Sequence, residues 1–318
     1  MTTNIRLVLP GLFEPHMLQV MEPETKQLHD LLVSQLTKAD SSPAKEDLYQ
    51  DLYQLGPEHL QYIPWLIGAQ QSATKVLLRA DPVILEPTHN GIVCRGNGIL
   101  HLAQDEQDDI VQLFNDYFQP QGLSLSFLTP YQAVVEITNK DMTDANFSPL
   151  ADVLGQDITH HLPGGRAGRS WQSVLMETQM LLARSETNLQ RSEQGEKTVG
   201  SLWFWGNTEV PKTRGALSQS MIYTDHPVLR HAFMDKSKPL AEFSFDNLSD
   251  SDVFSERLEL ACIQNDPHSW QSAFQHCYKD YLSPAIEACK EGTIKSLEIV
   301  SESHQYLLKP WHRLRFWR

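Results

Sequence analysis

Residues 162–206 read LPGGRAGRSWQSVLMETQMLLARSETNLQRSEQGEKTVGSLWFWG, and this stretch decides more of the fold than any other. It joins a Gly/Arg-rich loop, an amphipathic helix, a polar turn and a Trp-rich block. Apolar residues at helical spacing predict a helix over 171–182, with Ser170 as its N-cap and one face made of Trp171, Val174, Leu175, Thr178 and Leu182. In the Trp-rich block, Trp203 and Trp205 would share one face of a strand, with Phe204 on the other.

The overall composition is that of a folded protein with an acidic surface. The chain has 318 residues, of which 41% are hydrophobic, so it is long enough for two domains. Its formal net charge of −14 argues against general binding to nucleic acid or acidic membranes, which need a positive field.

The N-terminal sequence and the cysteines indicate the cellular compartment. The N-terminal MTTNIRLVLPGLF lacks the charged start and long apolar core of a signal peptide and predicts a strand. No run is long enough to cross a bilayer. The four cysteines are widely spaced, which favours reduced thiols. We expect a cytoplasmic location.

The pattern of apolar residues changes near residue 76 and divides the chain into two kinds of segment. From residue 76 onward, short apolar runs predict strands, including a hairpin over 92–102 around the turn Arg95-Gly96-Asn97-Gly98. An acidic helix start at Asp105 follows, and its apolar face is predicted to be Ile110, Leu113, Phe114 and Tyr117. The fold class is therefore predicted as α/β, with a core domain of residues 1–75 and 207–318 and an α+β domain, 76–206, inserted in it.

The Gly/Arg-rich loop, residues 164–169, is a candidate anion site. Backbone N–H groups near a helix start, together with the guanidinium groups of Arg166 and Arg169, suit phosphate or carboxylate. The loop matches neither a Walker loop nor the dinucleotide fingerprint. The alternative is a surface loop with two solvated arginines.

A second candidate group follows the predicted helix. Asn188, Arg191 and Ser201 are polar residues beside an aromatic block, and such residues usually have a partner. Arg79 and Asp81 lie between two predicted strands, 76–78 and 83–85, and are assigned to the same ligand site. We expect Trp203 and Trp205 to be structural.

The C-terminal residues are basic and aromatic in an acidic protein. Trp311, Arg313, Arg315 and Trp317 would either dock on the protein's own core or present a surface to a protein partner. Internal docking is the favoured interpretation.

Catalytic signatures are absent from the sequence. The adjacent His160 and His161 would point to opposite sides of a strand, and no Ser/His/Asp order or paired-carboxylate pattern stands out. We predict no catalytic residue, no metal site and no cofactor.

The pattern LPGG…GRSW…ETQMLL…N..R…G…SLWFWG resembles the bacterial regulatory proteins of the RpfE type, which look like relatives of the archaeal-type, cofactor-independent phosphoglycerate mutases. The resemblance extends from Arg79-Ala80-Asp81-Pro82 to the terminal Arg-Phe-Trp-Arg. It implies a degenerate alkaline-phosphatase-like core with an inserted α+β domain, in which the positions of Asn188, Arg191 and Arg79 belong to the substrate-side domain.

Three departures from the mutase pattern bear on function. The metal-binding Asp-Gly after the first strand is replaced by Pro10-Gly11, and a later Asp-His by Ser303-His304. The usual His-Pro-Val-Asn is Glu186-Thr187-Asn188-Leu189. The resemblance with these departures implies that the two-metal centre is lost.

Three hypotheses remain from the sequence. The first is a non-catalytic binding or regulatory protein with a residual phosphate-type pocket. The second is an active metal-dependent phosphoglycerate mutase or phosphatase with rearranged ligands, for which Asp30, Asp225 and His226 are the substitute candidates. The third is a protein-interaction module that uses the C-terminal residues.

Overall fold

The computed structural model describes residues 3–44, 47–66, 76–89, 91–96, 100–206, 220–245, 248–263 and 266–314. The chain forms two compact units, each with its own hydrophobic core. Unit 1 comprises residues 1–56, 212–262 and 266–318, and unit 2 comprises residues 57–211 and 263–265. Segment 57–75, expected in the first domain, therefore groups with unit 2.

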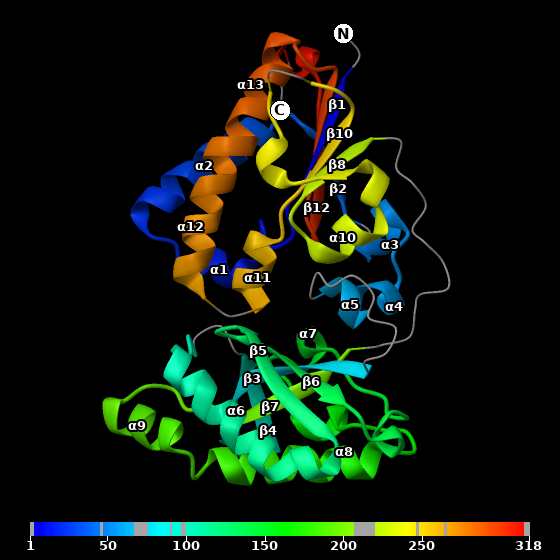
Figure 1. Ribbon diagram of the computed structural model, residues 1–318. Helices are drawn as coiled ribbons and strands as arrows, with labels where there is room; N and C mark the ends of the chain where they lie inside the picture. Colours follow the sequence, from blue (N-terminus) through cyan, green and yellow to red (C-terminus); the bar gives the residue numbers. More distant parts are fainter. Residues whose placement is uncertain are drawn as a thin grey trace. The chain divides into compact units, whose positions relative to one another are not determined.

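Unit 1 is a three-layer α/β structure around a mostly parallel sheet (Figure 1). Its strands are β1 (Asn4–Val8), β2 (Asp40–Pro43), β8 (Met221–Thr224), β9 (Ser237–Lys238), β10 (Ser251–Phe254), β11 (Ser296–Val300) and β12 (His304–Leu308). Its helices are α1 (Pro15–Gln19), α2 (Pro23–Leu36), α3 (Leu48–Tyr53), α10 (Pro227–Ala232), α11 (Arg257–Ile263), α12 (Pro267–Cys277) and α13 (Ser283–Glu291).

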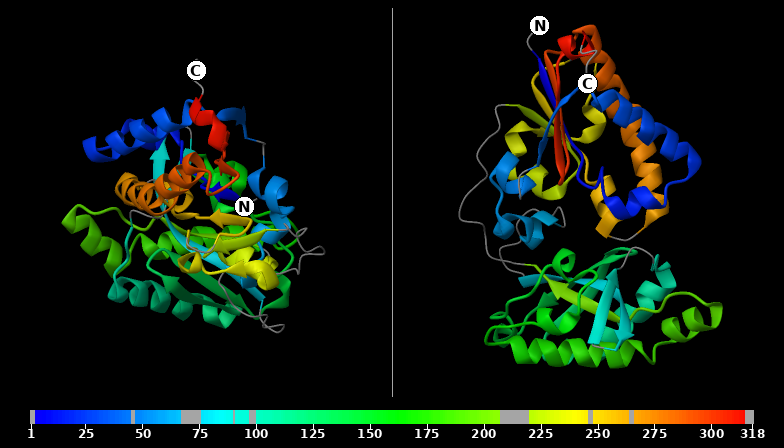
Figure 2. Two further views of the ribbon diagram at one scale, coloured as in Figure 1. Left: turned by 90° about the horizontal axis from the view of Figure 1, so that it is seen from above. Right: turned by 180° about the vertical axis from the view of Figure 1, so that it is seen from behind.

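The sheet of unit 1 has the order β2-β12-β11-β1-β10-β8-β9. Strands β11, β1, β10, β8 and β9 run parallel, and β12 and β2 are antiparallel additions at one edge. Helices α2, α12 and α13 lie along one face, and α3 and α10 along the other (Figures 1 and 2). The parallel strands therefore end together at one edge, where α/β proteins commonly place their ligands.

Unit 2 is an antiparallel sheet covered by helices. Its strands are β3 (Val76–Thr88), β4 (Gly91–Gly96), β5 (Leu123–Thr129), β6 (Gln132–Ile137) and β7 (Ser201–Trp205). Its helices are α4 (Pro57–Leu60), α5 (Ile63–Leu66), α6 (Gln104–Phe118), α7 (Leu150–Val153), α8 (Gly168–Leu182) and α9 (Glu186–Gln194). The order is β4-β3-β6-β5, and β7 also pairs with β3.

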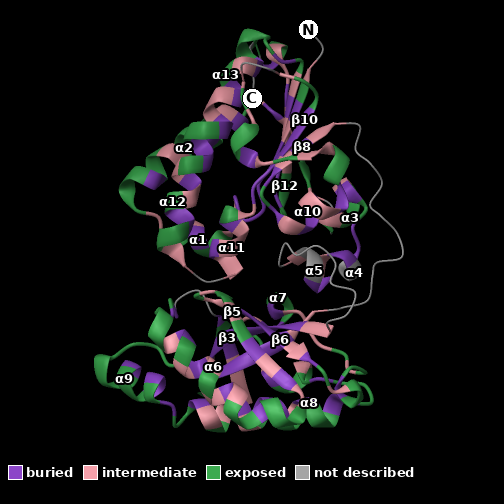
Figure 3. Ribbon diagram, in the orientation of Figure 1, coloured by how far each residue is buried: buried purple, intermediate pink, exposed green. Residues whose placement is uncertain are grey.

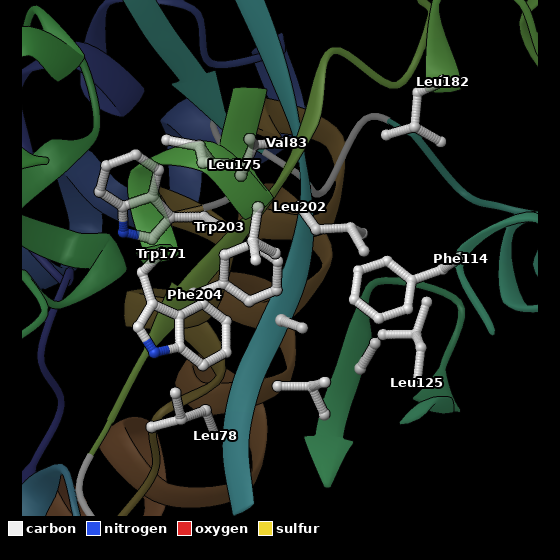
Figure 4. Packing of buried hydrophobic residues seen from close by; sticks show 14 of the residues in the cluster. Leu78, Val83, Phe114, Leu125, Trp171, Leu175, Leu182, Leu202, Trp203 and Phe204 are labelled. Atoms are coloured by element: carbon white, nitrogen blue, oxygen red, sulfur yellow. The ribbon is translucent and has the colours of Figure 1, made fainter. Parts of the chain in front are cut away.

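The core of unit 2 is aromatic. Trp171 of α8 lies 5.0 Å from Phe204 of β7, measured between ring centroids, and Phe114 of α6 lies 6.4 Å from Phe204 (Figure 4). The predicted helix and strand of residues 162–206 thus form the centre of this unit, because their apolar faces pack on each other.

Several local predictions need correction. Helix α8 begins at Gly168 rather than Trp171, and its N-cap is Ala167, not Ser170. The hairpin joins β3 to β4, with Thr88 opposite Gly91, so the chain reverses before the predicted turn. Residues 97–99 of that turn lie outside the described residues. Tyr117 is largely exposed, and Phe118 takes its expected place in the core.

Strand β3 runs without a break through Pro82, where two separate strands were expected. It pairs with β6 only as far as Arg79, and then with β7 over residues 79–83. A proline is tolerated there because the ladder with β6 has already ended. In no helix of the described ranges is there a span long and apolar enough to cross a membrane.

Candidate functional site

The carboxyl edge of the parallel sheet in unit 1 gathers a set of acidic side chains. Thr224 ends β8, Phe254 ends β10 and Val300 ends β11. Each strand is followed within two residues by an acid, and a further acid lies in the first turn of α11. We call Asp225, Glu256, Glu259 and Glu302, together with His226 and Tyr49, the edge cluster.

Each carboxylate of the edge cluster already has a partner. Glu302 Oε2 accepts the Gly11 N–H at 2.6 Å, and Glu259 Oε2 accepts the Tyr49 hydroxyl at 3.0 Å. Asp225 Oδ1 accepts a backbone N–H from Leu240 at 3.1 Å. These contacts join separate segments of unit 1 to one another, since Tyr49 lies on α3 and Glu259 on α11.

His226 and Glu256 form a second, largely buried pair of the cluster. The Nε2 atom of His226 lies 3.4 Å from Glu256 Oε2, and its Nδ1 accepts the Leu229 N–H at the start of α10. Because Nδ1 is an acceptor, the neutral ring carries its proton on Nε2, facing Glu256.

Burial shifts the titration of this cluster. Burial, together with the charges of Glu259 and Asp225, raises the pKa of Glu256 to about 8. Burial also raises the pKa of Glu259 to about 7, against the opposing hydrogen bond from Tyr49. Burial lowers the pKa of His226 to about 3. Near neutral pH the pair of His226 and Glu256 is therefore largely uncharged.

The loop after β1 is bonded to two other segments of unit 1 through Gly11. The N–H of Gly11 is held by Glu302, and its carbonyl accepts the Trp270 indole N–H at 2.8 Å. Gly11 has φ +80°, and a Cβ atom there would lie 2.8 Å from the Leu258 carbonyl carbon. Only glycine fits this position. Pro10, beside it, offers no side-chain donor.

The side chains near the carboxyl edge of unit 1 were compared with the ligands that a two-metal centre needs. In the described part of the chain, no three His, Cys, Asp or Glu side chains are grouped as metal ligands. His304 Nδ1 lies 3.0 Å from Ser303 Oγ, and the ring of His304 stacks on Tyr306. Asp30 lies on α2, where its exposed carboxylate is 3.9 Å from His29. The residues present do not fit a two-metal centre, which needs several anionic oxygens around each dication.

In unit 2, Arg79 and Asp81 form a buried ion pair. Arg79 donates from Nε at 3.0 Å and from Nη2 at 2.8 Å to Asp81. Asp81 also accepts the Trp205 indole N–H at 2.8 Å and the Ala133 N–H at 3.2 Å. Burial raises the pKa of Asp81, and the Arg79 charge and these donors oppose the rise. The Asp81 carboxylate is thus fully occupied by donors within the sheet, and it holds two of the three guanidinium nitrogens of Arg79.

Asn188 and Arg191 tie α9 to the body of unit 2. Asn188 donates to the carbonyls of Leu182 and Val199, each at 2.8 Å, and accepts the Val199 N–H at 2.7 Å. Arg191 donates to the Leu100 carbonyl and lies 3.4 Å from Glu106.

Ser201, at the start of β7, is fully buried and donates to the Leu202 carbonyl at 3.3 Å. All three predicted polar residues, Asn188, Arg191 and Ser201, therefore make contacts inside the unit.

The Gly/Arg-rich loop is bonded to the segment before it, so the N–H groups of Gly164, Ala167 and Gly168 are not free for a ligand. Gly164 exchanges two backbone hydrogen bonds with Asn146, at 2.9 and 3.0 Å, and the Ala167 N–H bonds to the Asp144 carbonyl. Gly165 has φ +82°, and a Cβ on Gly168 would meet the Pro163 oxygen at 2.8 Å. The glycines serve close backbone approach.

The predicted arginines do not converge. Arg166 is 82% exposed and pairs with Asp144 at 3.2 Å, and Arg169 is exposed in the first turn of α8. Arg191 belongs to the other end of α8, because Asn188 bonds to Leu182 there. A helix of 15 residues is about 22 Å long, so one anion cannot contact both groups.

A groove of about 320 Å³ lies in unit 2 beside this loop. Its lining includes Asp144 and Asn146, and on its apolar side Val76, Leu78 and Ile137. Arg166 reaches it through the ion pair with Asp144. Residues 67–75 and 207–219, which adjoin the lining residues Val76 and Gly206, lie outside the described residues.

The C-terminal segment docks in part on unit 1. His312 is buried, with Nε2 at 3.5 Å from Asp40 Oδ2. Trp311 is exposed, and the Lys309 ammonium lies over its ring at 5.2 Å. Arg315 and Trp317, and the side chain of Arg313, lie outside the described residues.

Sequence reasoning missed most of the edge cluster. Glu256, Glu259, Glu302 and Tyr49 were not predicted, although a usable signal exists: Ser-Glu follows the apolar strand ends at both Phe254 and Val300. Two acids placed alike after two strands suggest one shared edge, but only if both strands are known to be parallel neighbours of β1.

Comparison with known proteins links the chain to phosphoglycerate mutases. It is 23% identical over 180 residues to the 2,3-bisphosphoglycerate-independent phosphoglycerate mutase of Methanosarcina mazei, covering 55% of this chain and 45% of that protein. It is 23% identical over 146 residues to the enzyme of Methanosarcina barkeri, covering 46% of this chain and 36% of that protein. The chain is related to these mutases, and it spans less than half the length of each.

Two solved structures align with most of the chain. A cofactor-independent phosphoglycerate mutase from Thermoplasma acidophilum aligns over 97% of this chain and 90% of its own, with 11% identity and a TM-score of 0.35. The PH0037 protein from Pyrococcus horikoshii aligns over 97% and 87%, with 10% identity and a TM-score of 0.43. Both scores are low, so the fold rests on the chain's own sheets and helices. No family model matches the chain.

Proposed function

We propose that the chain is a non-catalytic binding or regulatory protein related to the cofactor-independent phosphoglycerate mutases, of the RpfE type. We further propose that unit 1 is a degenerate alkaline-phosphatase-like core in which unit 2 is an insertion. The parallel sheet of unit 1 and its division into segments on both sides of residues 57–211 support this.

The observation that carries the proposal is the chemistry at the carboxyl edge of unit 1. A two-metal phosphoryl-transfer centre needs clustered carboxylates whose repulsion the dications cancel. Here Pro10 follows β1, and the acids that remain bind Gly11, Tyr49 and Leu240 instead. Burial, with the charges of Glu259 and Asp225, raises the pKa of Glu256 to about 8, so this acid is neutral near pH 7 without a cation beside it.

The set of residues that we propose for ligand binding is smaller than the set predicted from the sequence. We assign Arg79, Asp81, Asn188, Arg191 and Ser201 to the internal bonding of unit 2, because their polar groups contact neighbours there. Arg166 and Arg169 remain as the exposed cations for a phosphorylated or carboxylate ligand, at the surface before α8.

The second hypothesis, a mutase or phosphatase with rearranged ligands, has one observation in its favour. Burial, and after it the charges of Glu259 and Asp225, raise the pKa of Glu256, so a cation entering the edge cluster would relieve the part that comes from repulsion. In the cluster as it stands, one oxygen of Glu259 accepts the Tyr49 hydroxyl and one oxygen of Glu302 accepts the Gly11 N–H.

One experiment separates the two functions. The purified protein is dialysed against chelator, its metal content is measured, and Mn²⁺, Mg²⁺ or Zn²⁺ is added back before assay with 3-phosphoglycerate. We expect no stoichiometric metal and no mutase or phosphatase turnover. Retention of metal that is lost in Glu256→Gln and Glu259→Gln, together with turnover, would establish the second hypothesis. The exposed Glu193→Gln serves as the matched control.

A further inference from the structure

The groove of about 320 Å³ in unit 2 has an apolar side and a polar side. The apolar side is lined by Val76, Leu78 and Ile137. Leu78 and Ile137 belong to the hydrophobic core of unit 2, and their strands, β3 and β6, are largely buried (Figure 3). Asp144 and Asn146 lie on the polar side. A volume of this size, with apolar walls and a few polar groups, is that of a site for a small molecule.

The polar side of the groove combines a fixed backbone with free side chains. The Met142 carbonyl accepts the Trp171 indole N–H at 2.8 Å, and Asn146 exchanges two backbone hydrogen bonds with Gly164, at 2.9 and 3.0 Å. The side chains of Asp144 and Asn146 are exposed, and the Asn146 carboxamide has no hydrogen-bond partner among the described residues. The backbone is therefore already ordered for a ligand, which lowers the entropic cost of binding.

Charges of both signs meet at the edge of the groove. Asp144 is the only charged side chain among the described residues that line it. The Nε atom of Arg166 lies 3.2 Å from Asp144 Oδ2, and the Arg166 side chain is 82% exposed. An exposed ion pair of this kind contributes little to stability, because water screens both partners. A ligand that offers each partner an opposite charge can therefore separate them at little cost.

A ligand with one charge suits this ion pair poorly. An anion at Arg166 would be repelled by Asp144, and a cation at Asp144 would be repelled by Arg166. A zwitterion places an opposite charge beside each of them. The three N–H donors of an ammonium group would find acceptors in the Asp144 carboxylate and the Asn146 carboxamide. A guanidinium group binds a carboxylate through two parallel hydrogen bonds.

We propose that the groove binds an α-amino acid with an aliphatic side chain. Asp144 contacts the ammonium group, and Arg166, on leaving its ion pair, contacts the carboxylate. The aliphatic side chain lies against the apolar side of the groove, where its burial is favourable. This inference rests on the proposed binding of a carboxylate by Arg166, and it names the class of molecule that carries the carboxylate.

Isothermal titration of the full chain with leucine and two analogues tests the proposal. The analogue 4-methylpentanoate lacks the ammonium group, and 3-methylbutylamine lacks the carboxylate. Leucine is expected to bind at least about ten-fold more tightly than either, because only leucine satisfies both charges. An analogue that binds as tightly as leucine, or a failure of leucine to bind, would overturn the proposal.

A matched pair of variants tests the role of Asp144. Asp144→Asn keeps the shape of the side chain and removes its charge, so the preference for leucine over 4-methylpentanoate should disappear. Asp141→Asn changes an exposed acid of the same segment that does not line the groove, and the preference should remain. An unchanged preference in Asp144→Asn would contradict the assignment of the ammonium group.

Inorganic phosphate separates this inference from the proposed function. Phosphate binding that is lost in Arg166→Ala/Arg169→Ala, with no preference for leucine over 4-methylpentanoate, would overturn the amino-acid proposal and leave the anion-binding surface in place. A preference for leucine without any binding of phosphate would support the amino acid and remove phosphate as the ligand. Binding of none of these probes would overturn both.

Discussion

Arg79 and Asp81 form a buried ion pair on one face of β3. The Asp81 carboxylate also replaces a backbone hydrogen bond that β3 no longer makes to β6. The ladder between β3 and β6 ends at Arg79, and the next available N–H of β6, that of Ala133, bonds to the Asp81 carboxylate instead. On the other side Asp81 accepts the Trp205 indole of β7. One carboxylate therefore joins three strands around Pro82.

Removing the Arg79 guanidinium should destabilise unit 2. Arg79→Met leaves the buried Asp81 carboxylate uncompensated, which typically costs about 3–5 kcal/mol. Urea unfolding followed by tryptophan fluorescence measures this, since Trp171, Trp203 and Trp205 lie in unit 2. Arg95→Ala breaks the exposed pair with Glu86 on the same sheet and should cost at most about 1 kcal/mol. Unchanged stability of Arg79→Met would mean that Arg79 is free to serve a ligand.

Trp203 should be structural. Its side chain is buried, and its indole N–H bonds to the Ser148 carbonyl at 3.0 Å. Trp203→Ala is expected to cost about 3–5 kcal/mol in the free energy of unfolding. Trp311→Ala, at an exposed site, should unfold like the parent. If Trp203→Ala keeps the parent's unfolding midpoint while binding is lost, the indole is part of a ligand site.

Stability should fall as pH rises from about 6.5 to about 8. Glu256 and Glu259 have raised pKa values in the folded protein, near 8 and 7, so they hold protons there that the unfolded chain has lost. Their contribution is present at low pH and is lost as pH passes these values. His226, with a folded pKa near 3, acts oppositely, because its contribution is lost as pH falls below about 6.5.

Urea midpoints at pH 6.5 and pH 8 measure this dependence. Glu256→Gln keeps the shape of the side chain and removes the titration, so the drop between the two pH values should shrink by about 1–3 kcal/mol. Glu193→Gln, at an exposed position, should retain the full drop. A drop that is equal in Glu256→Gln and the parent would contradict the assignment.

Phosphate should bind weakly and only through the loop before α8. Arg166 is exposed and already paired with Asp144, so a phosphate there competes with a carboxylate and with water. We expect a Kd of about 1 mM or weaker by isothermal titration. Arg166→Ala/Arg169→Ala should abolish the signal, and Arg184→Ala, an exposed arginine after α8, should keep it. Micromolar binding would require a converging pocket that the described residues do not form.

The sequence by itself determined the elements and the aromatic core of unit 2. The spacing of Trp171, Val174 and Leu175 predicts the buried face of α8, and the alternation around Phe204 predicts β7, because these periods follow from backbone geometry alone. Both predictions are confirmed. Composition likewise indicated two folded parts, with the strand-rich part in the middle of the chain.

Only the tertiary structure decided what the polar residues do. Asp81 contacts Trp205 and Gly11 contacts Glu302 across 124 and 291 residues of sequence, and no local sequence pattern predicts contacts over such separations. Arg166 and Arg169 lie at the start of α8, Arg191 follows its other end, and Arg79 lies on β3. The acids that do share an edge follow separate strands. A helix or strand is specified by its own residues, but a site is specified by which strands become neighbours, and that depends on the packing of the whole unit.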